Sequence, residues 1–201
     1  DFEREFHILA GPSNRYPSDP ISERHIAWIK ANKERVIAFL EAEIRGGRIL
    51  GLPCNGINCA LFADKAAGTK ILIEAFNNLR TQIELLNRLE ARQIAMSKAY
   101  GPGPDPLRGD CYYQYKFGME DFSGDLVGLA LEYKIQLPLH HIWQMVDEDL
   151  GQIHAVRYLM AFAETDKHIR EKLLAGYNDP RSKLHGDLEI KHWLATQGEK
   201  K

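Results

Sequence analysis

The sequence predicts a mainly α protein with a helical, bundle-like core and a small sheet of two or three strands. The helices are predicted by apolar residues that recur every three to four positions in two long segments and again beyond residue 123. The sheet is predicted by CYYQYKFG at 111–118, which is aromatic and weakly alternating, and by the short apolar run RILGL at 48–52.

The first long helix is expected over residues 19–47. Pro20 suits the first turn of a helix, Asp19 or Ser22 can cap it, and glycines at positions 46 and 47 supply a stop. Apolar residues at helical spacing form its buried face: Ile26, Ile29, Val36, Leu40 and Ile44.

A short helix is expected over 59–67, where Gly68 can end it. Thr69 can then cap a second long helix that continues to residue 100. One stripe of this second helix is apolar, and it consists of Leu72, Phe76, Leu79, Ile83 and Leu86.

The stretch GPGPDPLRGD at 101–110 divides the chain, because three prolines and three glycines in ten residues prevent regular structure. We therefore expect an N-terminal part over 1–100, a loop with an aromatic strand over 101–122, and a C-terminal helical part over 123–201, packed as one domain with the first. Helical segments are expected in the C-terminal part at 124–135, 139–150, 151–177 and 188–195.

The composition is that of a folded protein, with 44% hydrophobic and 27% charged residues. A net charge of -2 gives no overall field that would attract nucleic acid or an anionic membrane, and no apolar run approaches the length that spans a bilayer. Three cysteines are too few for a disulfide framework and fit a reducing compartment, so we expect a cytoplasmic protein.

Cys59 is a candidate nucleophile, because a thiol in the first turn of a helix meets unpaired backbone N–H groups that lower its pKa. The segment NCALFADKAAG at 58–68 resembles papain-like amidases, which implies an amidase- or transferase-like enzyme with Cys59 as thiolate and a histidine as base. The alternatives are a metal-binding pair with Cys54, or a small buried side chain that packs the helix start.

Three histidines of the C-terminal part, His140, His141 and His154, lie near acidic residues in the sequence. Imidazole and carboxylate groups on helices suit zinc, iron or manganese, so these residues are candidate metal ligands of a helical enzyme. The alternative places them on half-buried helix faces, and the sequence indicates no particular cofactor.

The segment GDLVGLALEYKIQLPLHHIWQMVDED at 124–149 resembles a helix-turn-helix. Within it, LALEYKIQLPL at 129–139 resembles the C-terminal helical domain of hydroxyacid dehydrogenases, and GDLVGLALEYKI at 124–135 resembles part of a MazG-type nucleotide pyrophosphohydrolase. The dehydrogenases need a G-x-G-x-x-G turn, which the chain lacks before residue 123. A recognition helix with acids at 147–149 would repel phosphates, so nucleic acid is not an expected partner. A packed helical hairpin explains the same residues.

An aromatic cluster follows the proline-rich loop, and its candidate binding residues are Tyr112, Tyr113, Tyr115 and Phe117. Tyrosine pairs a large apolar area with a polar tip, which is typical of binding surfaces. We therefore predict a binding or accessory subunit of a larger assembly that uses the surface around 101–122. The expected partner is a protein or peptide, with a small-molecule ligand as the alternative.

Overall fold

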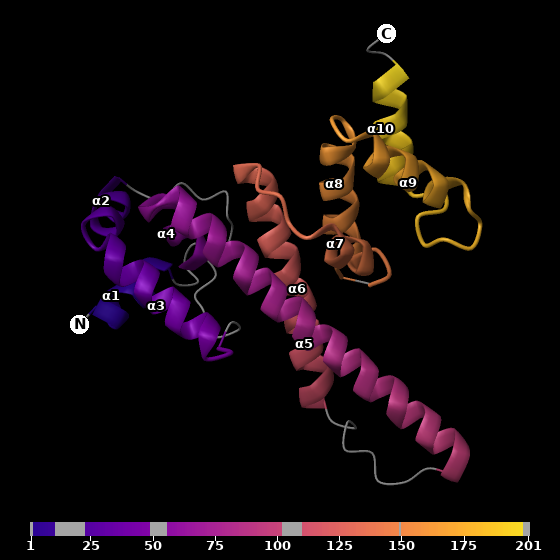
Figure 1. Cartoon of the computed structure of the whole chain (residues 1–201), viewed down its shortest axis with the longest axis horizontal. Helices are drawn as coiled ribbons and strands as arrows, with labels where there is room; N and C mark the ends of the chain where they lie inside the picture. Colours follow the sequence, from indigo (N-terminus) through magenta and orange to yellow (C-terminus); the bar gives the residue numbers. More distant parts are fainter. Residues whose placement is uncertain (1, 11–22, 49–55, 102–109, 149, 199–201) are drawn as a thin grey trace. The chain divides into compact units, whose positions relative to one another are not determined.

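The structure is a computed structural model that describes residues 2–10, 23–48, 56–101, 110–148 and 150–198. These residues form ten α-helices and no strand, so the mainly α prediction is confirmed and the small predicted sheet is wrong. The chain divides into two compact units, residues 1–119 and 120–201 (Figure 1). None of the helices in the described ranges combines the length and the apolar character that crossing a lipid bilayer requires.

The first unit is built around the short helix α4 (Gly56–Ala63), whose residues from Gly56 to Leu61 are all buried. Around it lie α1 (Phe2–Ala10), α2 (Glu23–Ala31), α3 (Lys33–Arg45) and the start of α5 (Lys65–Tyr100). α4 is apolar apart from Asn58, and a helix of this composition requires partners on most sides, which explains its central place.

The expected helix over 19–47 is two helices in the described residues, because the chain turns at Asn32 between α2 and α3. The Asn32 side chain donates a hydrogen bond at 3.0 Å to the Trp28 carbonyl, which also accepts the Asn32 backbone N–H at 3.0 Å. The predicted core residues Val36, Leu40 and Ile44 are buried as expected.

The boundary between α4 and α5 also differs from the prediction. Asp64, rather than Thr69, caps the long helix, and its carboxylate accepts hydrogen bonds from the backbone of Ala66 and Ala67 at 2.9 and 3.1 Å. Gly68 does not end a helix but lies in the first turns of α5, where the two helices approach closely. A Cβ atom built at Gly68 would lie 2.5 Å from the backbone nitrogen of Leu61.

The segment expected as an aromatic strand belongs to α6 (Asp110–Tyr133). Its buried residues have helical spacing and include Met119, Ser123, Leu126, Val127 and Ala130. α6 begins at Asp110, so residues 111–118 are helical and the weak alternation of their aromatic residues does not mark a strand. The other strand candidate, 48–52, falls almost entirely outside the described residues.

The second unit contains the end of α6, α7 (Leu139–Met145), α8 (Gln152–Ala163), α9 (Lys167–Asn178) and α10 (Leu188–Gly198). The expected segment 151–177 is two helices because Asp166 caps α9 through the backbone of His168 and Ile169. The helix expected near 188–195 is confirmed by α10.

A buried tyrosine fixes the link between α6 and α7. The hydroxyl of Tyr158 accepts a hydrogen bond from the Leu137 backbone at 2.7 Å and donates one to the Ile135 carbonyl at 3.2 Å. At the start of this link Lys134 has a φ of 56°, and the bonds from Lys134 and Ile135 back to α6 form a Schellman cap. The position of α7 within its unit is therefore set by defined polar contacts.

Candidate functional site

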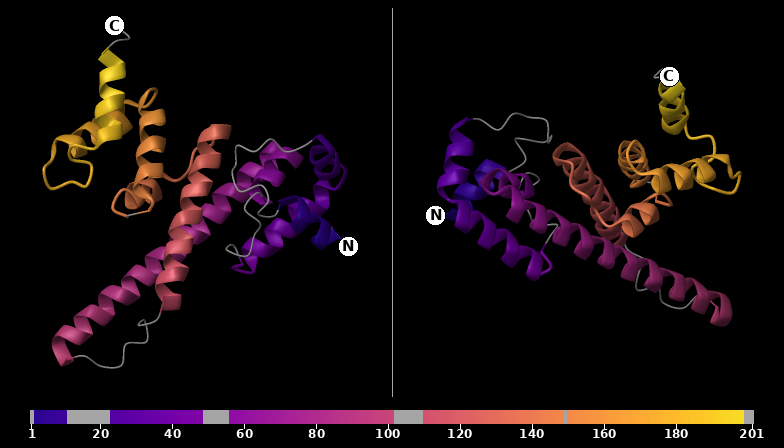
Figure 2. Two further views of the ribbon diagram at one scale, coloured as in Figure 1. Left: turned by 180° about the vertical axis from the view of Figure 1, so that it is seen from behind. Right: turned by 45° about the horizontal axis from the view of Figure 1, so that its top comes forward.

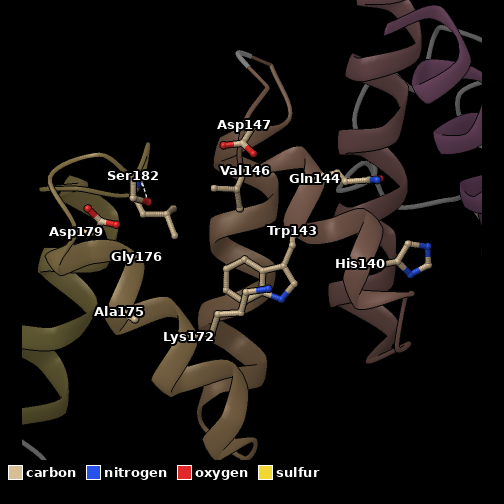
Figure 3. A pocket seen from close by; sticks show the side chains of 11 residues that line it. His140, Trp143, Gln144, Val146, Asp147, Lys172, Ala175, Gly176, Asp179 and Ser182 are labelled. Atoms are coloured by element: carbon tan, nitrogen blue, oxygen red, sulfur yellow. Dashed lines mark hydrogen bonds between the residues drawn. The ribbon is translucent and has the colours of Figure 1, made fainter. Parts of the chain in front are cut away.

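A pocket of about 550 Å³ lies in the second unit, between α7 with its following turn and α9 with its following loop (Figure 3). The first wall presents residues 140, 143, 144 and 147, and the second presents residues 172, 175, 176 and 179. Both sets follow the i, i+3, i+4, i+7 spacing of a single helix face, so each wall is one face of its helix.

Small residues on α9 create the hollow. Ala175 and Gly176 lie at the middle of the second wall, and a Cβ atom at Gly176 would lie 2.8 Å from Cδ1 of Leu184. Val146 and Leu184 are buried and give the pocket an apolar floor. A larger residue at position 176 would press on this floor and fill the space.

The pocket carries one charged group of each sign without an ionic partner in the described residues. The ammonium of Lys172 lies over the ring of Trp143, 4.2 Å from its centroid. The exposed Asp147 carboxylate makes neither a hydrogen bond nor an ion pair there, although its backbone carbonyl accepts a bond from Lys183 at 2.6 Å. Figure 3 shows the Lys172 side chain against the Trp143 ring and the Asp147 carboxylate apart from both.

The second carboxylate of the pocket is already engaged. Asp179 accepts hydrogen bonds from the guanidinium of Arg181 at 3.2 Å, and these bonds lower the pKa of its carboxyl group. The hydroxyl oxygen of Ser182 accepts a bond from the Leu184 backbone at 3.1 Å. Asp179 and Ser182 therefore order the loop, whereas the side chains of Asp147 and Lys172 form no ion pair among the described residues.

The three candidate metal ligands do not form a metal site. His140 lines the pocket, His141 is buried with Nδ1 3.0 Å from Oε1 of Gln144, and the His154 ring packs against Gly124. No group of three or more metal-ligating side chains occurs among the described residues. The prediction of a metal site from these histidines is therefore not supported: the rings of His140 and His141 lie 3.9 Å apart on α7, but His154 on α8 does not complete a group with them.

Near His154, the half-buried Asp125 has a carboxyl pKa above its usual value. Burial is the main cause, the charge of Asp121 adds to it, and His154 opposes it. These groups form a titratable cluster beside α8, but within the described residues they do not complete a metal site. We assign them no role in the pocket.

Cys59 lies in α4 and is only 1% exposed. Burial raises the pKa of its thiol to about 12, which is the opposite of the lowering expected for a helix-start nucleophile. Cys59 is therefore a small buried side chain of the first core, which was the alternative interpretation. Its possible partner Cys54 lies outside the described residues.

The aromatic binding surface predicted around 101–122 is described only in part. Tyr115 and Phe117 are 47% and 46% exposed on α6, whereas the side chains of Tyr112 and Tyr113 lie outside the described part of the structure. The ammonium of Lys116 pairs with the Glu90 carboxylate at 3.2 Å, which ties this part of α6 to α5. The prediction that these aromatic residues bind a partner stays a prediction.

The exposed half of α5 carries four apolar residues on one face, which we call the α5 stripe: Leu85, Leu89, Met96 and Tyr100. They are 57%, 44%, 53% and 87% exposed in that order. Figure 2 shows this half of α5 extending beyond α1 to α4 of the same unit. The buried stripe of this helix, which ends near residue 86, was predicted from the sequence, whereas the exposed stripe was not.

The pocket residues Trp143, Lys172 and Asp147 were also missed. The matched spacing of the two walls, with an alanine and a glycine in the middle of one, is the signal that could have found them. That signal lies in two segments about thirty residues apart, and nothing in the sequence pairs them.

Comparison of the chain with protein-family models, with curated proteins and with solved structures found no match in any of the three. No residue role can therefore be transferred from a relative. The function has to be inferred from contacts, burial and charge in the chain itself.

Proposed function

We propose that the chain is a binding subunit of a larger assembly and that it docks through the exposed half of α5, where it pairs with a second copy of the same chain. The supporting observation is the α5 stripe. The aromatic residues on α6, including Tyr115 and Phe117, belong to the same unit and extend the surface available to further partners.

The members of the α5 stripe share one face because of the helical period. At about 100° per residue, the four residues fall within a sector of about 60° around the helix axis, as two pairs on either side of Arg92. Their exposed apolar area is on the order of a few hundred Å², and exposed apolar area of that size on one face is typical of an interaction site.

The stripe faces away from the contacts that α5 makes within its own unit. Glu90, which pairs with Lys116, lies about 110° around the helix from the middle of the stripe. Glu84 and Arg88 pair with each other along α5. These ion pairs stabilise α5 and its contact with α6, and they leave the stripe available to a partner.

A second copy is favoured because the spacing of the stripe is the same in both directions along the helix. Four residues separate Leu85 from Leu89, seven separate Leu89 from Met96, and four separate Met96 from Tyr100. An antiparallel pair about a twofold axis between positions 92 and 93 therefore places Leu85 opposite Tyr100 of the second copy, and Leu89 opposite Met96. Such self-complementarity is what an isologous dimer interface requires.

Sedimentation velocity over about 1 to 100 µM tests the proposal. We expect the mass of the wild-type chain to rise toward that of two copies, and the double variant Leu89→Glu, Met96→Glu to remain a single copy. The substitutions bring four carboxylates together in the centre of the pair, and they act on exposed side chains, so the fold is expected to persist.

Leu188→Glu is the matched control, because Leu188 is 78% exposed on α10 and lies outside the stripe. It should associate like the wild type. A wild-type chain that stays at the mass of one copy throughout, or a double variant that associates as tightly as the wild type, would contradict the proposal. Far-UV circular dichroism verifies that each variant keeps its helices.

A further inference from the structure

We infer that the pocket between α7 and α9 binds a short peptide of two or three residues with both ends free. The ammonium group of the peptide would lie at Asp147, its carboxylate at Lys172, and an apolar side chain on the floor formed by Val146 and Leu184 beside Trp143. This inference is independent of the proposed pairing through α5, which involves the other unit.

The size of the pocket sets the ligand class. A volume of about 550 Å³ lies within the range of about 300 to 1,000 Å³ that is usual for small-ligand sites. Its apolar floor of Val146 and Leu184 with a few polar groups around it also has the composition of such sites. A folded protein domain could not enter it, whereas a small molecule could.

The charges of the pocket favour a ligand with both signs. A purely cationic ligand would bring a second positive charge beside Lys172, and a purely anionic ligand would meet Asp147 and the nearby Asp179. A zwitterion pairs each free group with its opposite. Asp179 is not the expected ammonium site because Arg181 already occupies its oxygens.

The arrangement of the charges sets the length of the ligand. Figure 3 shows the Asp147 carboxylate apart from the Lys172 side chain, which lies against the Trp143 ring. A single amino acid carries both charged groups on one carbon, whereas the two charges of a peptide stand at the two ends of its chain. Each further residue of an extended chain adds about 3.3 to 3.6 Å, so a peptide of two or three residues can engage both side chains at once.

The aromatic ring supports this geometry. Lys172 is held 4.2 Å from the centroid of the Trp143 ring, and this contact orders a side chain that would otherwise move freely. The ammonium is thus positioned at the pocket before a ligand arrives. An ordered donor costs less entropy when a carboxylate binds it than a mobile one does.

Calorimetric titration with the tripeptide Ala-Phe-Ala, its N-acetylated form and its C-terminal amide tests the inference. We expect the free tripeptide to bind, and each blocked form to bind at least about tenfold more weakly, because each loses one charge-assisted contact. Asp147→Asn and Lys172→Met should each weaken binding of the free tripeptide by about the same factor. Binding should also change the tryptophan fluorescence of the wild type but not that of Trp143→Phe.

Glu171→Gln and Lys191→Met are the charge-matched controls, because both side chains are exposed and lie outside the pocket, and they should leave the affinity unchanged. No binding of the free tripeptide at about 10 mM would overturn the inference. Equal binding of the amide and the free acid would overturn it too, because the pocket would then select a cation alone. Tighter binding of the free tripeptide by Lys172→Met than by the wild type would also overturn the inference, because Lys172 would then repel the ligand.

Discussion

At the scale of single residues, burial decides the chemistry of Cys59 more strongly than its place near a helix start does. The free N–H groups of a first turn stabilise a thiolate only where water or a cation also reaches the sulfur. In α4 the thiol is enclosed by the first core, and the cost of burying a charge there raises its pKa to about 12. Spacing in the sequence does not reveal enclosure.

The raised pKa of Cys59 predicts that its thiol reacts slowly. At pH 8 a group with a pKa of about 12 is ionised to roughly one part in ten thousand, so Cys59 should react with an alkylating reagent about a thousandfold more slowly than an exposed thiol. Peptide mapping by mass spectrometry separates Cys59 from the other two cysteines. The same labelling in denaturant is the control and should be fast. Rapid labelling of native Cys59 would show that α4 is not enclosed.

At the scale of elements, α4 and α5 of the first unit approach each other closely at Gly68. A Cβ atom there would lie 2.5 Å from the nitrogen and 2.6 Å from the Cα of Leu61, both of which are backbone atoms that no side-chain rotation can move. Gly68→Ala should therefore force the helices apart and destabilise the protein by about 3 kcal/mol or more.

Gly128→Ala on α6 is the matched control, because a Cβ atom there meets nothing within 4 Å. Alanine is a better helix former than glycine, so this variant should gain about 0.5 to 1 kcal/mol. Urea unfolding monitored by circular dichroism measures both changes. A Gly68→Ala variant as stable as the wild type would mean that α4 and α5 do not cross at this point.

Much of the helical architecture could be predicted from the sequence, because a period of 3.6 in apolar residues is a local signal. The buried stripes with Leu40 and Leu72 and the helix α10 are examples. Two helix boundaries were predicted wrongly, at Asn32 and Asp64, where a polar side chain bonds to the backbone at the helix end. The strand predicted at 111–118 was also wrong, because its aromatic residues suggested an alternating pattern. There the helix that contains Met119 extends upstream to Asp110.

At the scale of the whole molecule, the two proposed sites belong to different units and have different origins. The pocket arises from two helix faces that are distant in the sequence, so only the tertiary structure brings Asp147 and Lys172 to one cavity. The α5 stripe lies within one helix, so its spacing is visible in the sequence. The sequence alone does not distinguish it from a buried face, and only the structure shows that its residues are exposed.

Pairing through α5 also predicts how the assembly responds to salt. With the twofold axis between positions 92 and 93, the Arg92 side chains of the two copies lie beside the axis and repel each other. Screening of this repulsion on going from about 0.05 M to about 0.5 M salt should tighten the pair by about threefold. The variant Arg92→Gln, which removes the charge, should associate more tightly than the wild type at low salt. Its association should then increase little when salt is added.

Arg88→Gln separates this effect from a general strengthening of apolar contacts by salt. Arg88 pairs with Glu84 and lies opposite Ser97 of the second copy in the proposed arrangement, so its replacement should leave the salt response unchanged. Sedimentation equilibrium at the two salt concentrations measures all three chains. An association of the wild type that weakens with salt would require attractive ion pairs across the interface, and the antiparallel arrangement centred on positions 92 and 93 would then be wrong.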